Sequence, residues 1–148
     1  MNSAAHGFEE LTIESLHAGF RAGTITAHEV TQWYLDRIAD SGLNAVVTTN
    51  RRALDEAAEL DRRWAPGAPV GPLHGVPVLV KDQGETAGIP TSFGSKLFAD
   101  YIPQRDCTVV ARLRTAGRPF VNRCEADHSV LISKRGRKLQ DKRFAFAF

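Results

Sequence analysis

The sequence predicts an α/β fold in which helices cover a largely parallel sheet. Amphipathic segments that begin with helix-capping residues alternate with short apolar runs, and stretches rich in glycine and proline separate them. The apolar run at residues 76–80 has no polar face, which is typical of a strand in a sheet covered on both sides. Alternation of helices and strands is typical of α/β proteins.

The N-terminal part of the chain predicts two helices. Thr12 can cap the first helix, and Gly23 closes it. Thr26 followed by Glu29 is the pattern of a capping box, in which each side chain covers a free backbone N–H of the first turn. This second helix is expected to stop at Gly42. Its apolar residues share one face: Val30, Trp33, Tyr34 and Ile38.

The middle of the chain predicts two strands and a helix between them. Residues 45–47 are a short apolar run, and Asn50 is expected to open a helix that continues to Arg63. The inner face of that helix is expected to carry Leu54, Ala57 and Ala58. Residues 66–72 contain three prolines and two glycines and cannot be helical. The strand at residues 76–80 follows directly.

Loops and turns are expected after this strand, because the next stretch is interrupted by Gly84, Gly88, Pro90 and Gly94. Asp106 is expected to cap a last amphipathic helix that ends at Gly117. Its inner residues would be Val109, Val110 and Leu113. Beyond Gly117 the pattern weakens: residues 129–132 resemble a short strand, residues 134–138 form a basic run, and residues 144–148 alternate Phe with Ala.

The composition is that of an ordinary globular domain. The chain has 148 residues, of which 43% are hydrophobic and 24% charged, and these values exclude a disordered, collagen-like or coiled-coil protein. No apolar run approaches the ~20 residues of a membrane-spanning helix, and the first ten residues show no secretory signal. Two cysteines are too few for a disulfide framework or a zinc site. We therefore expect a soluble, cytoplasmic protein.

The charge distribution divides the chain near Gly117. Residues 1–117 carry 11 Lys and Arg against 14 Asp and Glu, whereas residues 118–148 carry 8 against 3. The net charge of +2 therefore hides a mildly acidic part and a basic one. We expect a flexible N-terminus at residues 1–10, a domain at residues 11–117 and a divergent basic tail at residues 118–148.

Lys81 is the main candidate for a catalytic residue. It follows the apolar strand at residues 76–80, precedes Asp82 and faces a glycine-rich loop. Ligands of α/β sheets bind beyond the carboxyl ends of the strands, and a lysine removed from water can act as a base. The residues alone favour a structural interpretation, in which Lys81 forms an ion pair with Asp82 or another carboxylate.

Two neighbouring segments resemble the amidase signature family. They are Gly-Pro-Leu-His-Gly-Val-Pro-Val-Leu-Val-Lys-Asp at residues 71–82 and Thr-Ala-Gly-Ile-Pro-Thr-Ser-Phe-Gly-Ser at residues 86–95. The resemblance extends to three further stretches, at residues 11–12, 24–38 and 105–117. A match over about residues 11–117 is far more specific than a lone short motif. It implies the N-terminal fragment of the amidase-signature fold, a mixed β-sheet covered by α-helices, in incomplete form.

The resemblance also implies a reaction, which is hydrolysis of carbon–nitrogen bonds in amides by a Ser-Ser-Lys triad. Lys81 matches the lysine, which acts as the base. In the family a bridging serine in a cis peptide relays the proton, and a second serine attacks the carbonyl to form an acyl-enzyme. This mechanism implies no metal and no organic cofactor.

The two serines of the triad are not found in this sequence, which contains no Gly-Gly-Ser-Ser-Gly-type segment. Ser92 and Ser95 match turn positions of the family and are expected to bond backbone groups. Residues 120–125 match the family's next strand only loosely, and no match is visible from Ser129 onward. We therefore expect a truncated amidase that has the lysine but is inactive alone. Its intact parent would act on a small-molecule amide, which the sequence does not identify.

Other functions stay open at this point. A short non-catalytic chain could bind a partner or another subunit, and an incomplete sheet would expose an edge for self-association. The basic stretch at residues 134–143 lacks a nucleic-acid-binding motif, so a nucleic-acid partner is not expected. His74 and Cys107 are expected to be structural. No metal site is defined by the remaining candidates, Cys124, Asp127 and His128.

Overall fold

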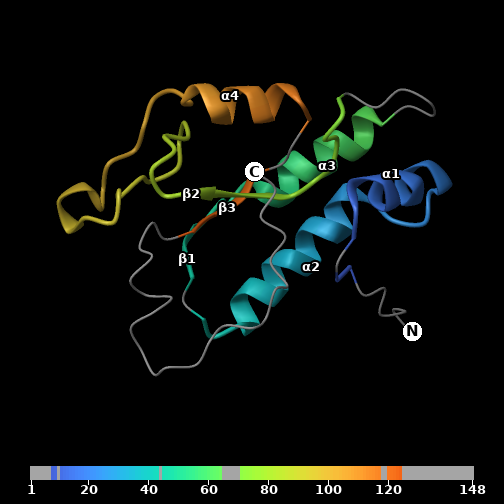
Figure 1. Ribbon diagram of the computed structural model, residues 1–148, viewed down its shortest axis with the longest axis horizontal. Helices are drawn as coiled ribbons and strands as arrows, with labels where there is room; N and C mark the ends of the chain where they lie inside the picture. The colour runs from blue at the N-terminus through green and yellow to red at the C-terminus, as the bar shows by residue number, and fades with distance from the viewer. Residues whose placement is uncertain (1–7, 10, 44, 65–70, 118–119, 125–148) are drawn as a thin grey trace.

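The computed structural model describes residues 8–9, 11–43, 45–64, 71–117 and 120–124 (Figure 1). The expectations for residues 1–7 and for residues 125–148 lie outside this part of the chain. The elements are α1 (Ile13–Ala22), α2 (Ala27–Asp40), β1 (Val46–Thr49), α3 (Ala53–Arg63), β2 (Val78–Lys81), the 3-10 helix η1 (Lys96–Phe98), α4 (Thr108–Thr115) and β3 (Phe120–Cys124).

The three strands form a mixed sheet in the order β1-β3-β2. Strand β3 pairs antiparallel with β1 and parallel with β2, so the sheet is less parallel than the apolar run at residues 76–80 predicted. Parallel neighbours need a long crossover, and here the loop after β2 and helix α4 provide it. Helix α2 packs on α3, α3 contacts β3, and α4 lies on the other side of the strands from α2 (Figure 1).

The first two helices begin where their capping residues predict. The side chain of Thr12 accepts a hydrogen bond from Ser15 N at 3.1 Å, and Gly23 ends α1 in the left-handed conformation at φ 66°. At the start of α2, Thr26 accepts a bond from Glu29 N at 3.1 Å, and the Glu29 carboxylate accepts one from Thr26 N at 2.8 Å. The capping box is therefore confirmed.

A second cap on α2 comes from a different helix. The carboxylate of Asp61, in the last turn of α3, accepts hydrogen bonds from Ala27 N at 2.7 Å and from His28 N at 3.0 Å. These are two of the first N–H groups of α2, which have no partner within the helix. A negative charge at this end is also favoured by the helix dipole. Asp61 therefore joins α3 to α2 through polar contacts as well as packing.

Two predicted helix starts differ from the structure. Helix α3 begins at Ala53, because Asn50 forms the preceding turn by accepting a bond from Arg52 N at 3.0 Å. Asp106 does not cap α4: Cys107 occupies that position without a side-chain bond. The Asp106 carboxylate instead accepts from Ala87 N and from Arg114 Nε, both at 2.8 Å, and so ties the loop after β2 to α4.

The core lies where α1, α2 and α3 meet. Its buried residues are Leu16, Phe20, Ala27, Val30 and Ala57. The buried face of α3 carries Ala53, Ala57 and Leu60, whereas Leu54 and Ala58, expected on that face, are only half-buried. Gly75 closes this core from the loop side at φ +70°, and a Cβ atom there would lie 2.7 Å from Phe20 Cε2. Only glycine fits this position without a shift of Phe20.

Candidate functional site

Lys81 is the last residue of β2 and is exposed. In the parallel register it stands beside Cys124, the last residue of β3, so it lies at the carboxyl end of both strands. Within the described part of the chain, Lys81 makes no ion pair. The pairing with Asp82 that the residues alone favoured is therefore not seen, and the amine is left at the sheet edge where ligands of α/β folds bind.

Asp82 bonds the following loop instead of Lys81, a role that the sequence did not indicate. Its side chain is only 2% exposed, and its carboxylate accepts hydrogen bonds from Ser92 N at 3.1 Å and from the Ser92 hydroxyl. Its backbone carbonyl accepts a further bond from Phe93 N at 3.2 Å. Asp82 thus fastens the turn at residues 92–94 against the residue that follows Lys81. A buried carboxylate that is bonded in this way fixes its neighbours firmly.

The two serines after Lys81 are structural, as expected from the turn positions they match. Ser92 Oγ donates to Asp82 and accepts a bond from Gly94 N at 3.2 Å. Ser95 caps η1 by accepting a bond from Leu97 N at 3.3 Å. The Ser92 hydroxyl therefore bonds the Asp82 carboxylate as well as the turn backbone, and the Ser95 hydroxyl bonds the backbone of η1.

The loop between β2 and α4 is held by backbone bonds along its length. Gly88 N donates to Pro103 O at 3.0 Å, and Thr91 N donates to Tyr101 O at 2.8 Å. The Tyr101 hydroxyl donates to the Glu85 carboxylate at 2.6 Å, and this bond raises the pKa of Tyr101 above its usual value. The loop is therefore an ordered platform beside Lys81.

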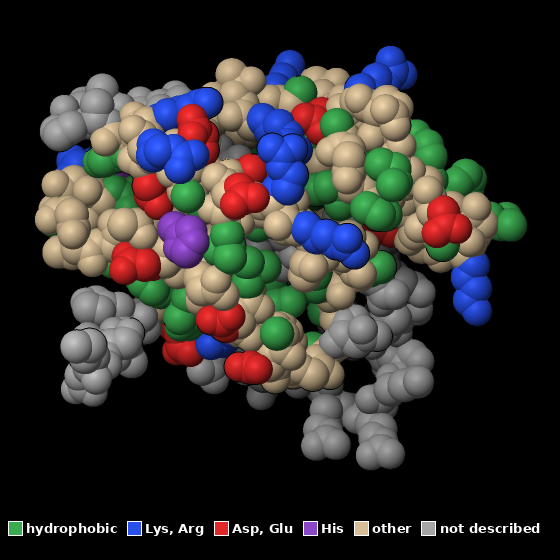
Figure 2. Space-filling model, turned by 180° about the vertical axis from the view of Figure 1, so that it is seen from behind, with side chains coloured by type: hydrophobic (Ala, Val, Ile, Leu, Met, Phe, Trp, Pro, Cys, Tyr) green, Lys and Arg blue, Asp and Glu red, His purple; other side chains and the backbone are tan. Residues whose placement is uncertain are grey.

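The outer end of this loop is apolar. Phe93, Phe98 and Tyr101 form a ring cluster with centroids 5.6 to 6.4 Å apart, and Leu97 beside them is 92% exposed. We call these four residues, together with the exposed Ile102, the aromatic tip. Figure 2 shows hydrophobic side chains gathered at this end of the molecule, on the right of the view. Exposed clusters of this kind mark interaction surfaces more often than isolated apolar residues do.

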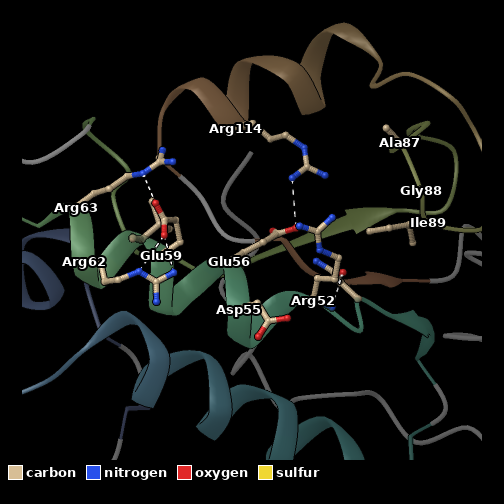
Figure 3. Close-up of a pocket in the computed structure, with 13 residues that line it drawn as sticks. Arg52, Asp55, Glu56, Glu59, Arg62, Arg63, Ala87, Gly88, Ile89 and Arg114 are labelled. Carbon is tan, nitrogen blue, oxygen red and sulfur yellow. Dashed lines mark hydrogen bonds and ion pairs between the residues drawn. The ribbon is translucent and has the colours of Figure 1, made fainter.

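A cavity of about 680 Å³ lies away from Lys81, between α3, residues 87–89 and the end of α4 (Figure 3). Its charged side chains largely neutralise one another: Glu59 pairs with Arg62 and Arg63, and Arg114 with Glu56. Sequence reasoning missed this cavity because its walls come from separate segments. The balanced charges favour no particular ligand class.

The two residues that the sequence predicts to be structural, His74 and Cys107, are wholly or partly buried. His74 is 1% exposed, and burial is the main reason why its pKa is lowered from the ordinary value of 6.5. Cys107 is half-buried in the N-cap position of α4. Among the described residues no group of three or more His, Cys, Asp or Glu side chains could hold a metal ion. Asp127 and His128 lie outside these residues. No helix in the described ranges is long and apolar enough to cross a membrane.

The sequence matches a known protein family over most of its length. The family model described as Amidase matches residues 29–136. The chain belongs to the amidase family. This match runs past Gly117 and Ser129, so the family resemblance continues into the segment where the residues alone suggested that it ends. The segment includes β3, whose pairing with β2 supports a family strand at residues 120–124.

The amidase chain is similar to curated and solved relatives over most of its length. A glutamyl-tRNA(Gln) amidotransferase subunit from Salinispora tropica is 46% identical over 114 residues, which cover 75% of this chain and 23% of the relative. A peptide amidase from Stenotrophomonas maltophilia superimposes with a TM-score of 0.73 at 39% identity, over 78% of this chain and 24% of that one. An amidase family protein from Bacillus anthracis gives the same TM-score at 31% identity. The chain thus spans about a quarter of the length of its relatives, and its fold is that of the corresponding part of the amidase-signature fold.

Proposed function

We propose that this chain supplies the lysine of an amide-hydrolysing site, at Lys81, and that it does not hydrolyse amides by itself. One observation carries the proposal: an exposed lysine without an ion pair among the described residues ends β2 of an amidase-family fold. In the Ser-Ser-Lys mechanism the lysine acts as the base that activates a serine hydroxyl.

The expected inactivity rests on the two serines near Lys81. Ser92 Oγ is bonded to the buried carboxylate of Asp82, and Ser95 Oγ caps η1. A nucleophilic hydroxyl needs a base within hydrogen-bond reach, and neither serine is bonded to Lys81. The sequence also contains no Gly-Gly-Ser-Ser-Gly-type segment. The serines of the reaction would therefore come from a chain segment other than the 148 residues here.

The proposed substrate of the intact enzyme is a small-molecule amide. The names of the relatives support the class of bond, because they include a peptide amidase and amidotransferase subunits. The choice among amides is left open, since Lys81 is not among the residues that line the cavity between α3 and α4. The cytoplasmic location and the division of the chain near Gly117 stay predictions.

The first experiment measures ammonia release from a peptide amide by the purified chain. We expect no release above the buffer blank. Turnover that survives Ser92→Ala and Ser95→Ala but disappears in Lys81→Ala would contradict the proposed inactivity, because another nucleophile would then be present.

A chimera tests the role of the lysine itself. Residues 24–117 of this chain would replace the matched stretch of the Stenotrophomonas maltophilia peptide amidase. We expect Lys81→Ala in the active chimera to lower kcat at least about 100-fold, the usual contribution of a positioned base. Lys96→Ala is the matched control, since Lys96 is also exposed but lies in η1. Equal activity of the two variants would refute the assignment.

A second candidate function is non-catalytic binding to a partner or to another subunit. The aromatic tip favours it, because five exposed or partly exposed apolar side chains stand together on an ordered loop. Self-association through the sheet is a related prediction, since β1 and β2 each pair only with β3 among the described strands. Light scattering after size-exclusion chromatography tests self-association of the chain. A monomer at every concentration would count against self-association.

A further inference from the structure

Two histidines from distant parts of the chain meet beside the core. His17 of α1 donates from Nε2 to the backbone carbonyl of His74 at 2.9 Å. The His74 ring lies 4.9 Å from the Trp64 ring and 6.4 Å from the Phe20 ring, measured between centroids. Both contacts are made by aromatic side chains of the helical layer. His74 therefore sits at the point where α1, the end of α3 and the loop before β2 come together.

The turn that carries His74 is also bound to the end of α4. Leu73 N donates to Ala116 O at 3.2 Å, and Gly75 N donates to Gly117 O at 3.0 Å. The segment after Gly117 leads into β3, and the segment after Gly75 leads into β2. This turn thus connects the helices to both strands that meet at Lys81.

The surroundings of the His74 side chain disfavour a positive charge on its ring. It is 1% exposed, and Nδ1 is buried without a hydrogen-bond partner. A proton added at Nδ1 would create a buried N–H donor with no acceptor, next to two aromatic rings. Such a group is costly in a protein interior.

The charged groups around His74 do not offset the cost of protonating its buried ring. From α1, His17 opposes a charge on His74, whereas from α3 the Asp61 carboxylate and the Leu60 backbone favour it. The Asp61 carboxylate already accepts two N–H groups of α2, including that of His28. On the α4 side, the backbone carbonyls of Ala116 and Gly117 accept bonds from Leu73 N and Gly75 N. Burial outweighs the favourable contacts, and the pKa of His74 is lowered.

We propose that the turn of residues 71–75 is a pH-sensitive latch, which holds the helices to the strands around Lys81 while His74 is neutral and releases when His74 takes up a proton. Release loosens the turn from His17 and Trp64 and removes the support of β2. The latch concerns the fold of this chain and does not depend on the amide-hydrolase role of Lys81.

The sign of the pH effect follows from proton uptake. Because the pKa of His74 is lower in the folded chain than its ordinary value of 6.5, the unfolded chain binds more protons in weak acid. The contribution of His74 to stability is therefore constant above that value and falls as the pH drops below it. One extra proton in the unfolded state raises the unfolding equilibrium constant about tenfold per pH unit.

The test is urea unfolding of the full chain at a series of pH values between about 8 and 5, the range in which histidine titrates. We expect the unfolding constant of the wild-type chain to rise by up to about tenfold per pH unit below 6.5. His74→Gln, which cannot titrate, is expected to flatten this rise. His28→Gln is the matched control, because His28 is exposed and should leave the rise unchanged. A rise in His74→Gln equal to that of the wild type would overturn the proposal.

A direct titration covers the case in which His74→Gln does not fold. Nuclear magnetic resonance of the wild-type chain with labelled histidine rings gives the pKa of each imidazole. We expect one ring to titrate below the ordinary value, in step with a change in Trp64 fluorescence in a Trp33→Phe background. Titration of every histidine at or above 6.5 would refute the latch.

Discussion

Replacement of Gly75 by alanine is the sharpest test of the core. Gly75 has φ +70°, a conformation that residues with a Cβ atom rarely adopt. The added methyl would lie 2.7 Å from Phe20 Cε2, 2.9 Å from Phe20 Cζ and 3.1 Å from Ala27 Cβ. Phe20 is itself buried among core residues, so it has little room to move. The substitution therefore combines backbone strain with overpacking.

The magnitude follows from these two contributions. The left-handed conformation costs a residue with a Cβ atom about 1–2 kcal/mol. Overpacking of a filled core costs about 1–3 kcal/mol more. We expect Gly75→Ala to lower the free energy of unfolding by about 2–5 kcal/mol, a large share of the ~5–15 kcal/mol of a typical domain.

Gly88→Ala separates the two contributions. Gly88 has φ +74°, nearly the same as Gly75, but a Cβ atom there would meet nothing within 4 Å. Gly88→Ala should therefore lower the free energy of unfolding only by the backbone strain, about 1–2 kcal/mol. The assay is urea unfolding followed by circular dichroism for the wild type and both variants. If Gly75→Ala is no less stable than Gly88→Ala, Phe20 is not packed against this turn and the reasoning fails.

Two further predictions concern single hydrogen-bonding groups. Asp61→Ala removes the cap that α3 places on α2 and should lower the free energy of unfolding by about 0.5–2 kcal/mol, whereas Asp100→Ala on the exposed loop should change it little. Equal effects of these two substitutions in urea unfolding would argue against the cap. Glu85→Ala removes the acceptor of the Tyr101 hydroxyl, so the raised pKa of Tyr101 should fall toward 10.0. The phenolate absorbance during a pH titration reports this change, and an unaltered titration would contradict the bond.

Local sequence signals predicted the parts of the fold that depend on neighbours in the chain. Thr12 and Thr26 cap their helices because each bond spans only three residues. The cap assigned to Asp106 failed for a physical reason. Its carboxylate has stronger partners in Ala87 N and Arg114, one of them 19 residues away, and these outcompete the local N–H groups. Partners at such a separation leave no signal in a capping pattern.

The candidate site was predictable only in part. The apolar strand, the glycine-rich loop and the family resemblance all pointed to Lys81. They did not reveal that the Asp82 carboxylate bonds Ser92, because that contact spans ten residues of irregular loop. They also did not reveal that His17 and His74 meet, since 57 residues separate them. Long-range polar contacts depend on how the elements pack, which periodicity alone does not encode.

The central position of β3 sets an order for folding. Among the described strands, β1 and β2 touch only β3, and β3 is the last of the three in the chain. Helices α1, α2 and α3 can associate early, because their core residues lie within residues 16–57. During synthesis, however, β1 and β2 lack their shared partner among the described strands until residues 120–124 leave the ribosome. We therefore expect insertion of β3 between β1 and β2 to be the slow step of folding, because this step closes long loops.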